Sequence, residues 1–173
     1  MDPTLPRLHA RSERLDEEER DLIHALYDSL RRYAAVVGPP EEEPDDLVQE
    51  AFLRVLRRGP LTDLSNPGAY LRRTILNLSS NERRRLGRLR RAITRLATED
   101  REDDIYISDL GELMSLSPRT RAVLFLSAVE GYSFREVAEL VGCSEAAARK
   151  IASRERRRLR RRQELEVTRN AEA

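Results

Sequence analysis

The chain has 173 residues, the length of one medium-sized domain or of two small ones. Charged residues make up 36% and apolar residues 39%, with no Trp and three Phe, so each core must be small and mainly aliphatic. The single cysteine, Cys143, excludes an internal disulfide and a cysteine metal cluster, and His9 and His24 are too few for histidine-based catalysis. We therefore expect no enzyme activity, no metal and no cofactor. No segment approaches the ~20 apolar residues of a membrane span, and no basic-then-apolar leader is seen, so we expect a cytoplasmic protein without membrane insertion.

The net charge of +1 conceals a strong pattern of alternating blocks. Residues 1–60 carry a net charge of −5, residues 61–98 carry +7, residues 99–118 carry −6 and residues 119–173 carry +5. Two basic blocks separated by an acidic one indicate two contact surfaces for a polyanion. The alternative is that these charges only solvate helix faces.

Apolar residues at spacings of three and four predict helices along most of the chain. A first helix is expected to start near Asp16, and a second to span about Pro44 to Arg58. A third is expected to start at Asn66, which is followed by a proline, and to run to about Arg85 or beyond. The predicted fold class is all-α, with two small helical domains joined by a flexible acidic linker. The expected segments are a mobile N-terminal tail (1–15), a first helical domain (16–96), the linker (97–111), a second helical domain (112–163) and a polar C-terminal tail (164–173).

The third helix carries a polar stripe beside its apolar one. Tyr70, Thr74, Asn77 and Asn81 follow one another at spacings of four, three and four. Aromatic, hydroxyl and amide groups on a basic helix suit contact with nucleic-acid bases. The basic residues expected beside this stripe are Arg72, Arg73, Arg83, Arg84 and Arg85. The alternative is that Tyr70 belongs partly to the core and the asparagines are only solvated.

A helix-turn-helix is predicted in the second domain. Ser133 and Glu136 form a capping box that starts a short helix, and Gly142 and Cys143 provide a tight turn. Ser144 then caps a long basic helix, which completes the helix-turn-helix signature. The outward residues near the start of this helix, where such helices meet base edges, are Glu145, Ala146, Arg149, Lys150 and Arg154, and Arg157 follows where phosphate contacts are expected. A plain helical hairpin is the alternative.

Several stretches resemble extracytoplasmic-function (ECF) sigma factors of the sigma-70 family. Residues 116–126 (LSPRTRAVLFL) and 130–145 (EGYSFREVAELVGCSE) resemble region 4 of that family. Residues 46–55 (DLVQEAFLRV) resemble the core-binding helix of region 2, and residues 67–78 (PGAYLRRTILNL) resemble its promoter-melting helix. These stretches occur in the order that the family has. The resemblance implies a dissociable subunit of bacterial RNA polymerase that recognises −35 and −10 promoter elements and promotes DNA opening.

The resemblance also implies roles for individual residues. Asp46, Gln49, Glu50 and Leu53 would face the clamp helices of the largest polymerase subunit, and the second domain would meet the flap region of the second-largest subunit. The −10 surface would comprise Tyr70, which replaces the usual Trp, with Arg73, Asn77, Asn81 and Arg84. The −35 surface would comprise Ser144, Glu145, Ala146, Arg149, Lys150, Arg154 and Arg157. Regulation by an anti-sigma factor is a further expectation from the family.

Three other classes of protein share part of this sequence pattern. A helix-turn-helix regulator that never joins core polymerase would need neither the acidic helix at 44–58 nor the asparagine-bearing helix at 67–85. A nuclease or RNA-processing enzyme would need acidic metal ligands or a histidine site, which the basic segments lack. A helical adaptor would leave the basic second helix of the predicted helix-turn-helix unexplained.

Overall fold

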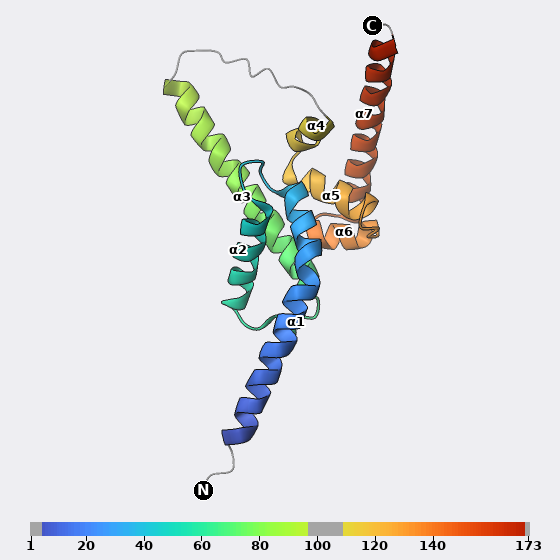
Figure 1. Ribbon diagram of the computed structural model, residues 1–173. Coiled ribbons are helices and arrows are strands. Elements are labelled where there is room, and N and C mark those ends of the chain that lie inside the picture. The colour runs from blue at the N-terminus through green and yellow to red at the C-terminus, as the bar shows by residue number, and fades with distance from the viewer. Residues whose placement is uncertain (1–4, 97–108, 172–173) are drawn as a thin grey trace.

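The computed structural model describes the backbone of residues 5–96 and 109–171, and the side chains of residues 17–81, 111, 113–158 and 160–161. All regular elements in this part of the chain are helical, which confirms the all-α prediction. In chain order they are α1 (Leu5–Val37), α2 (Pro44–Leu56), a 3-10 turn η1 (Leu61–Asp63), α3 (Pro67–Leu96), α4 (Asp109–Ser115), α5 (Pro118–Ala128), α6 (Phe134–Val141) and α7 (Glu145–Ala171). The long helices α1, α3 and α7 extend outward in different directions from a common centre (Figure 1).

Three helix ends differ from the sequence prediction. Helix α1 begins at Leu5, within the predicted N-terminal tail, because Pro6 falls in its first turn, where proline is tolerated, and no breaker follows before Gly38. Helix α7 continues to Ala171, through most of the predicted C-terminal tail, since no Gly or Pro interrupts it. Helix α4 occupies the end of the predicted linker, and the rest of that linker, 97–108, lies outside the described residues.

The N-terminal helices pack through apolar residues that recur at helical spacings of three and four. Val48, Phe52 and Val55 of α2 are buried against α1 and α3, and Leu71 and Ile75 of α3 are fully buried. Burial of these aliphatic and aromatic side chains supplies the main driving force for assembling the three helices. It also fixes which face of α2 and which face of α3 remain exposed.

The C-terminal helices form the predicted helix-turn-helix. The Ser133 Oγ accepts from the Glu136 amide at 3.3 Å, and the Glu136 carboxylate accepts from the Ser133 amide at 2.8 Å, so the capping box is confirmed. Gly142 ends α6 with a φ of 71°, a left-handed conformation that favours glycine. Ala148 and Ala152 bury one face of α7 against α5 and α6. The opposite face of α7 is left to solvent.

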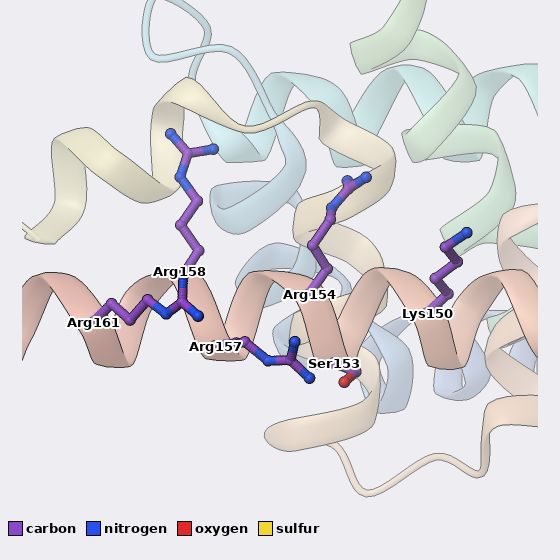
Figure 2. Close-up of a pocket in the computed structure, with 6 residues that line it drawn as sticks. All are labelled: Lys150, Ser153, Arg154, Arg157, Arg158 and Arg161. Atoms are coloured by element: carbon purple, nitrogen blue, oxygen red, sulfur yellow. The ribbon is translucent and has the colours of Figure 1, made fainter.

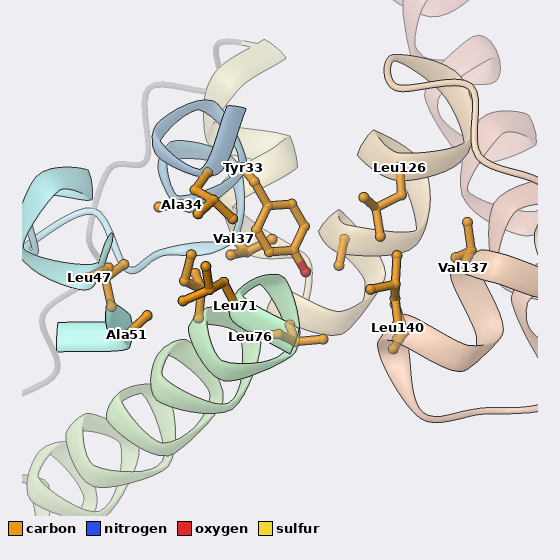
Figure 3. Packing of buried hydrophobic residues seen from close by; sticks show 14 of the residues in the cluster. Tyr33, Ala34, Val37, Leu47, Ala51, Leu71, Leu76, Leu126, Val137 and Leu140 are labelled. Atoms are coloured by element: carbon orange, nitrogen blue, oxygen red, sulfur yellow. The ribbon is translucent and has the colours of Figure 1, made fainter. Parts of the chain in front are cut away.

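The two groups of helices share one continuous core. Buried residues of α1, α2 and α3 belong to the same cluster as those of α5, α6 and α7. Figure 3 shows Tyr33 of α1 between its own helix and the side chains of α5 and α6. The Tyr33 ring lies 6.2 Å from the Phe125 ring, centroid to centroid. The N-terminal and C-terminal helices therefore pack against each other directly.

Candidate nucleic-acid interface

Basic side chains follow the exposed face of α7 and, with one serine among them, form a surface that we call the basic ridge. The residues that line a shallow depression of about 510 Å³ on this helix are Lys150, Ser153, Arg154, Arg157, Arg158 and Arg161. Figure 2 shows them along successive turns of the one helix. Lys150, Arg154, Arg157 and Arg161 repeat at spacings of four and three, on the side away from the buried Ala148 and Ala152. The ridge is therefore accessible to a polyanion along about three helical turns.

The residues at the start of α7 are held by local contacts. Ser144 Oγ accepts from the Ala147 amide at 3.2 Å and caps the helix. Glu145 forms an ion pair with Arg149 at 2.5 Å, and the Arg149 guanidinium lies 5.5 Å from the centroid of the Phe134 ring. The Arg149 side chain still keeps 64% of its surface exposed, and Ala146 beside it is exposed. The start of α7 thus presents a pre-oriented guanidinium to solvent.

Sequence reasoning missed two residues that orient this surface. The ring of Phe134 lies beneath the Arg149 guanidinium. The sequence did not indicate this contact, because an apolar residue at the start of α6 is expected in the core. Glu155 is buried in a basic stretch, where its carboxylate accepts from Arg154 Nε at 2.8 Å and lies 3.9 Å from Arg158. The helical period predicts Glu155 on the inner face of α7, which is the signal that could have found it.

A second basic surface lies where α2 meets α3. The residues that line a groove of about 320 Å³ there are Arg54, Val55, Arg58, Tyr70, Arg73, Thr74 and Asn77. Arg58 donates to the Tyr70 hydroxyl at 2.8 Å, and the Thr74 hydroxyl donates to the Tyr70 carbonyl at 2.9 Å. Four of the predicted −10 residues are thus exposed on one helix, three of them in this groove: Tyr70, Arg73 and Asn77, with Asn81 one turn further along α3.

The α2 contribution to this groove was not predicted. Arg54 of α2 and Arg58, in the turn that follows α2, were assigned no role from the sequence, although both line the groove. The side chain of Arg84 lies outside the described residues. Arginines at the mouth of a groove with an aromatic ring and an amide provide phosphate attraction beside groups that can stack or hydrogen-bond.

Arg72 does not join this surface, contrary to the expectation that it would flank the polar stripe. Its side chain is only 8% exposed, and its Nη2 forms an ion pair with Glu130 Oε2 at 2.9 Å. Its guanidinium also lies 5.6 Å from the centroid of the Tyr132 ring. The helical period explains the difference, because Arg72 follows the buried Leu71 on the inner side of α3.

The acidic residues of α2 form an exposed edge. Asp46, Gln49 and Leu53 are exposed, and Leu53 keeps 49% of its surface accessible. Glu50 forms an ion pair with Arg54 at 2.6 Å, so it is not a free charge. An exposed leucine beside acidic and amide groups is suited to contact with another protein rather than with a polyanion.

Two sequence models of one family match most of the described chain. The model described as "Sigma-70 region 2" matches residues 22–89, and the one described as "Sigma-70, region 4" matches residues 111–159. The chain belongs to the sigma-70 family. The match to region 2 contains the α2–α3 groove, and the match to region 4 contains the helix-turn-helix.

Relatives with known names place this sigma-70 chain in the ECF group. It is 30% identical over 152 residues to the ECF RNA polymerase sigma factor SigE of Mycolicibacterium smegmatis, covering 81% of this chain and 59% of that protein. It is also 30% identical over 151 residues to the ECF RNA polymerase sigma factor SigJ of Mycobacterium tuberculosis, covering 78% of this chain and 48% of that protein. The chain thus spans between about half and three fifths of the length of these curated relatives.

A solved structure shares the fold. The sigma factor RpoE from Bartonella quintana, in complex with the anti-sigma factor NepR, superimposes with a TM-score of 0.67 at 21% sequence identity. The match covers 84% of this chain and 96% of that one. At this identity the likeness establishes the all-helical architecture.

Neither a membrane span nor a metal cluster is found among the described residues. None of the helices there combines the length and apolar character that crossing a bilayer requires. No group of three or more His, Cys, Asp or Glu side chains in the same part of the chain is placed to hold a metal ion.

Proposed function

We propose that this chain acts as an ECF sigma factor that joins core RNA polymerase, binds promoter DNA at two elements and promotes strand opening. The observation that carries the proposal is the presence, in one chain, of a helix-turn-helix with a basic exposed face and a separate basic groove with an aromatic and an amide side chain. A simple DNA-binding regulator needs the first surface alone. The second surface suits a strand whose bases are unstacked.

The start of α7 is the proposed reader of the −35 element. An α-helix fits the major groove, and its first turns meet base edges there. Arg149 and Lys150 carry donors suited to guanine, and Glu145 carries an acceptor suited to cytosine. Arg154 and Arg157 continue the surface toward the phosphates, and Ser144 and Ala146 complete its start. This division separates base contacts from contacts that position the protein.

The α2–α3 groove is the proposed site for an unstacked base of the −10 element. Taking a base out of the stack costs a few kcal/mol, which new contacts must offset. Tyr70 offers a ring for stacking, Asn77 offers an amide for hydrogen bonds, and Arg73 attracts the phosphate. Asn81 and Arg84 would extend the same surface along α3.

The exposed edge of α2 is the proposed contact with polymerase. Asp46, Gln49, Glu50 and Leu53 would face the clamp helices of the largest subunit, and the helix-turn-helix domain would meet the flap region of the second-largest subunit. An anti-sigma factor is a further proposed partner, supported by the NepR partner of the structurally similar RpoE. These assignments imply a cytoplasmic, non-enzymatic protein.

Run-off transcription with purified core polymerase and no other sigma factor tests the proposal. Promoter fragments selected from a genomic library should give discrete transcripts only when the chain is added. Asp46→Arg should weaken co-purification with core polymerase, whereas Asp28→Arg, a reversal of an exposed aspartate on α1, should not. DNA binding without selective initiation would favour the helix-turn-helix regulator instead.

A further inference from the structure

We infer that Phe134 sets the base preference of the −35 surface, as a positioning residue for Arg149. The Phe134 ring and the Glu145 carboxylate hold the Arg149 guanidinium in one plane, with one end turned toward a single guanine. The inference rests on the proposed function of α7 as the reader of the −35 element. It adds which base Arg149 reads, and it names a residue outside the −35 surface that decides how strictly that base is read.

Two neighbours restrict the Arg149 side chain. Its Nη2 and Nε donate to the same Glu145 oxygen, Oε1, at 2.5 and 3.1 Å. Its central carbon, Cζ, lies over the Phe134 ring, 5.5 Å from the ring centroid. The carboxylate therefore takes one edge of the guanidinium and the ring covers one face, and we call Phe134 and Glu145 together the Arg149 clamp. The Arg149 side chain keeps 64% of its surface exposed, so the rest of the group faces solvent.

The two contacts of the clamp leave the Nη1 end of the guanidinium to act outward. The group is planar, and its N–H donors point in fixed directions. Because Glu145 uses the edge formed by Nε and Nη2, the outward fork consists of Nη1 and the second hydrogen of Nη2. A fork of two parallel donors fits guanine, which presents the O6 and N7 acceptors side by side in the major groove. Adenine presents N7 beside an amino group, which cannot accept the second hydrogen bond.

Phe134 belongs to α6, whereas the other two residues belong to α7. It is the first residue of α6, directly after Ser133, whose capping box with Glu136 defines the start of that helix. Its side chain is half-buried and packs against the common core. The Glu145–Arg149 ion pair lies within one helix, so by itself it lets both side chains move together. The ring from a second helix removes that freedom, because it gives the guanidinium plane a fixed surface to rest on.

A second arginine–glutamate pair in the helix-turn-helix provides a comparison. Arg135 and Glu139 of α6 form an ion pair of the same i,i+4 kind at 3.5 Å, with side chains 81% and 71% exposed. The Arg149–Glu145 pair is closer, at 2.5 Å, and its side chains are 64% and 43% exposed. Exposed ion pairs contribute little to stability by themselves. The clamp acts instead by restricting the Arg149 rotamers before DNA arrives, which lowers the entropy that is lost on binding.

NMR of the arginine side chains tests the clamp in the free chain. The ring current shifts a proton above an aromatic ring upfield, so the Arg149 Nε–H signal should lie upfield of its position in Phe134→Leu. The signal is identified by its loss in Arg149→Lys. Phe134→Tyr, which keeps the ring, should keep the shift, and Glu139→Gln, at an exposed glutamate of α6, should leave it unchanged. Coincident Arg149 signals in wild type and Phe134→Leu would contradict the clamp.

The base preference is measured with polymerase that carries each variant. Single-base −35 variants first locate the base pair at which Arg149→Ala relaxes the preference, which we expect to be a guanine–cytosine pair. At that pair, Phe134→Leu should lower the preference for guanine over adenine about two- to fivefold, which corresponds to an exposed cation–π contact. Phe134→Tyr should retain the preference. A loss of folding or of general affinity would weaken all sequences alike and leave this ratio unchanged, so the ratio separates positioning from stability.

A double-mutant cycle shows whether Phe134 acts through Arg149. In an Arg149→Ala chain, adding Phe134→Leu should change the preference at this pair no further. An unchanged ratio in the single Phe134→Leu variant, or the same change with and without Arg149, would overturn the inference. If Phe134→Leu fails to fold, Glu145→Gln weakens the other half of the clamp at a partly exposed position. It should move the Arg149 signal and lower the guanine preference at the same pair, and no change in either would count against the clamp.

The two measurements separate this inference from the proposed function. The NMR comparison needs neither polymerase nor promoter, so an Arg149 signal that Phe134→Leu moves retains the clamp even if run-off transcription fails. Run-off activity with a guanine preference that does not depend on Phe134 would instead keep the proposed function and remove the inference. A uniform loss for Arg149→Ala across all −35 variants would overturn the assignment of guanine to Arg149.

Discussion

Tyr27 donates a hydrogen bond from its hydroxyl to Asp45 Oδ1 at 2.7 Å, which ties α1 to the first turn of α2. Arg31 Nε adds a contact to Asp45 Oδ2 at 3.0 Å. The hydrogen bonds from Tyr27 and Arg31 hold the pKa of the Asp45 carboxyl below its ordinary value of 3.8. The hydrogen bond between Tyr27 and Asp45 also raises the pKa of the Tyr27 hydroxyl. Because Asp46 follows directly, this contact helps to set how the exposed edge of α2 faces a partner.

Asp45→Asn should reduce the free energy of unfolding at neutral pH but not in acid. The folded-state pKa of Asp45 lies below its unfolded value, so its stabilising contribution is present above about pH 4 and is lost as the pH falls through the folded value. Urea unfolding should therefore show a lower free energy of unfolding for the variant than for wild type at pH 7, and this difference should shrink toward pH 3.

The control for this pH dependence is Asp46→Asn, which makes the same change at the exposed neighbour. The free energy of unfolding of Asp46→Asn should differ little from that of wild type at both pH values. If Asp45→Asn lowers the free energy of unfolding as much at pH 3 as at pH 7, the Asp45 charge does not stabilise the fold through Tyr27 and Arg31.

Gly142→Ala should lower the free energy of unfolding by about 1–2 kcal/mol, because a left-handed backbone is costly for residues with a Cβ. The nearest atoms to the new Cβ are guanidinium nitrogens of Arg119 and Arg73 at 3.9 Å, an ordinary contact, so the cost lies in the backbone. Gly142→Asn should cost less, since asparagine tolerates this conformation. Equal losses for the two variants in urea unfolding would point to a steric cause instead.

The helices and the helix-turn-helix could be predicted from the sequence because their signals are local. The capping box at Ser133 and the glycine at Gly142 act within a few residues, and apolar spacing identifies the inner faces of α2 and α3. The contact between the two groups of helices could not be predicted in this way. Glu130 meets Arg72 across 58 positions, and no local pattern specifies such a pair.

Within the candidate site, too, local patterns were predictable from the sequence and contacts between distant residues were not. Asn77 and Tyr70 were predicted because they share a helical stripe, whereas Arg58 reaches Tyr70 from the turn that follows α2. Arg72 was misplaced because a charged residue on a basic helix is usually exposed, although the helical period places it on the inner side of α3, where its distant partner Glu130 pairs with it.

Asn77→Ala should impair promoter opening while core binding and folding stay intact. Asn77 is exposed in the α2–α3 groove, so its loss should change the free energy of unfolding by less than about 0.5 kcal/mol. Losing one hydrogen bond to an unstacked base should reduce the open complex about tenfold. Permanganate reactivity of unpaired thymines measures the opening. Ser80→Ala, on the same helix but not lining the groove, should open promoters normally.

Arg149→Ala and Arg157→Ala should affect −35 binding in different ways, because the first lies at the start of α7 and the second in the basic ridge. Loss of Arg149 should cost about 1–3 kcal/mol at one base pair and relax the preference there. Loss of Arg157 should weaken all sequences alike and reduce the slope of log affinity against log salt by about 1. Polymerase bearing each variant would be titrated against single-base −35 variants at several salt concentrations. A uniform loss for Arg149→Ala would make it a phosphate contact, held in place by Glu145 and Phe134 for charge rather than for reading sequence.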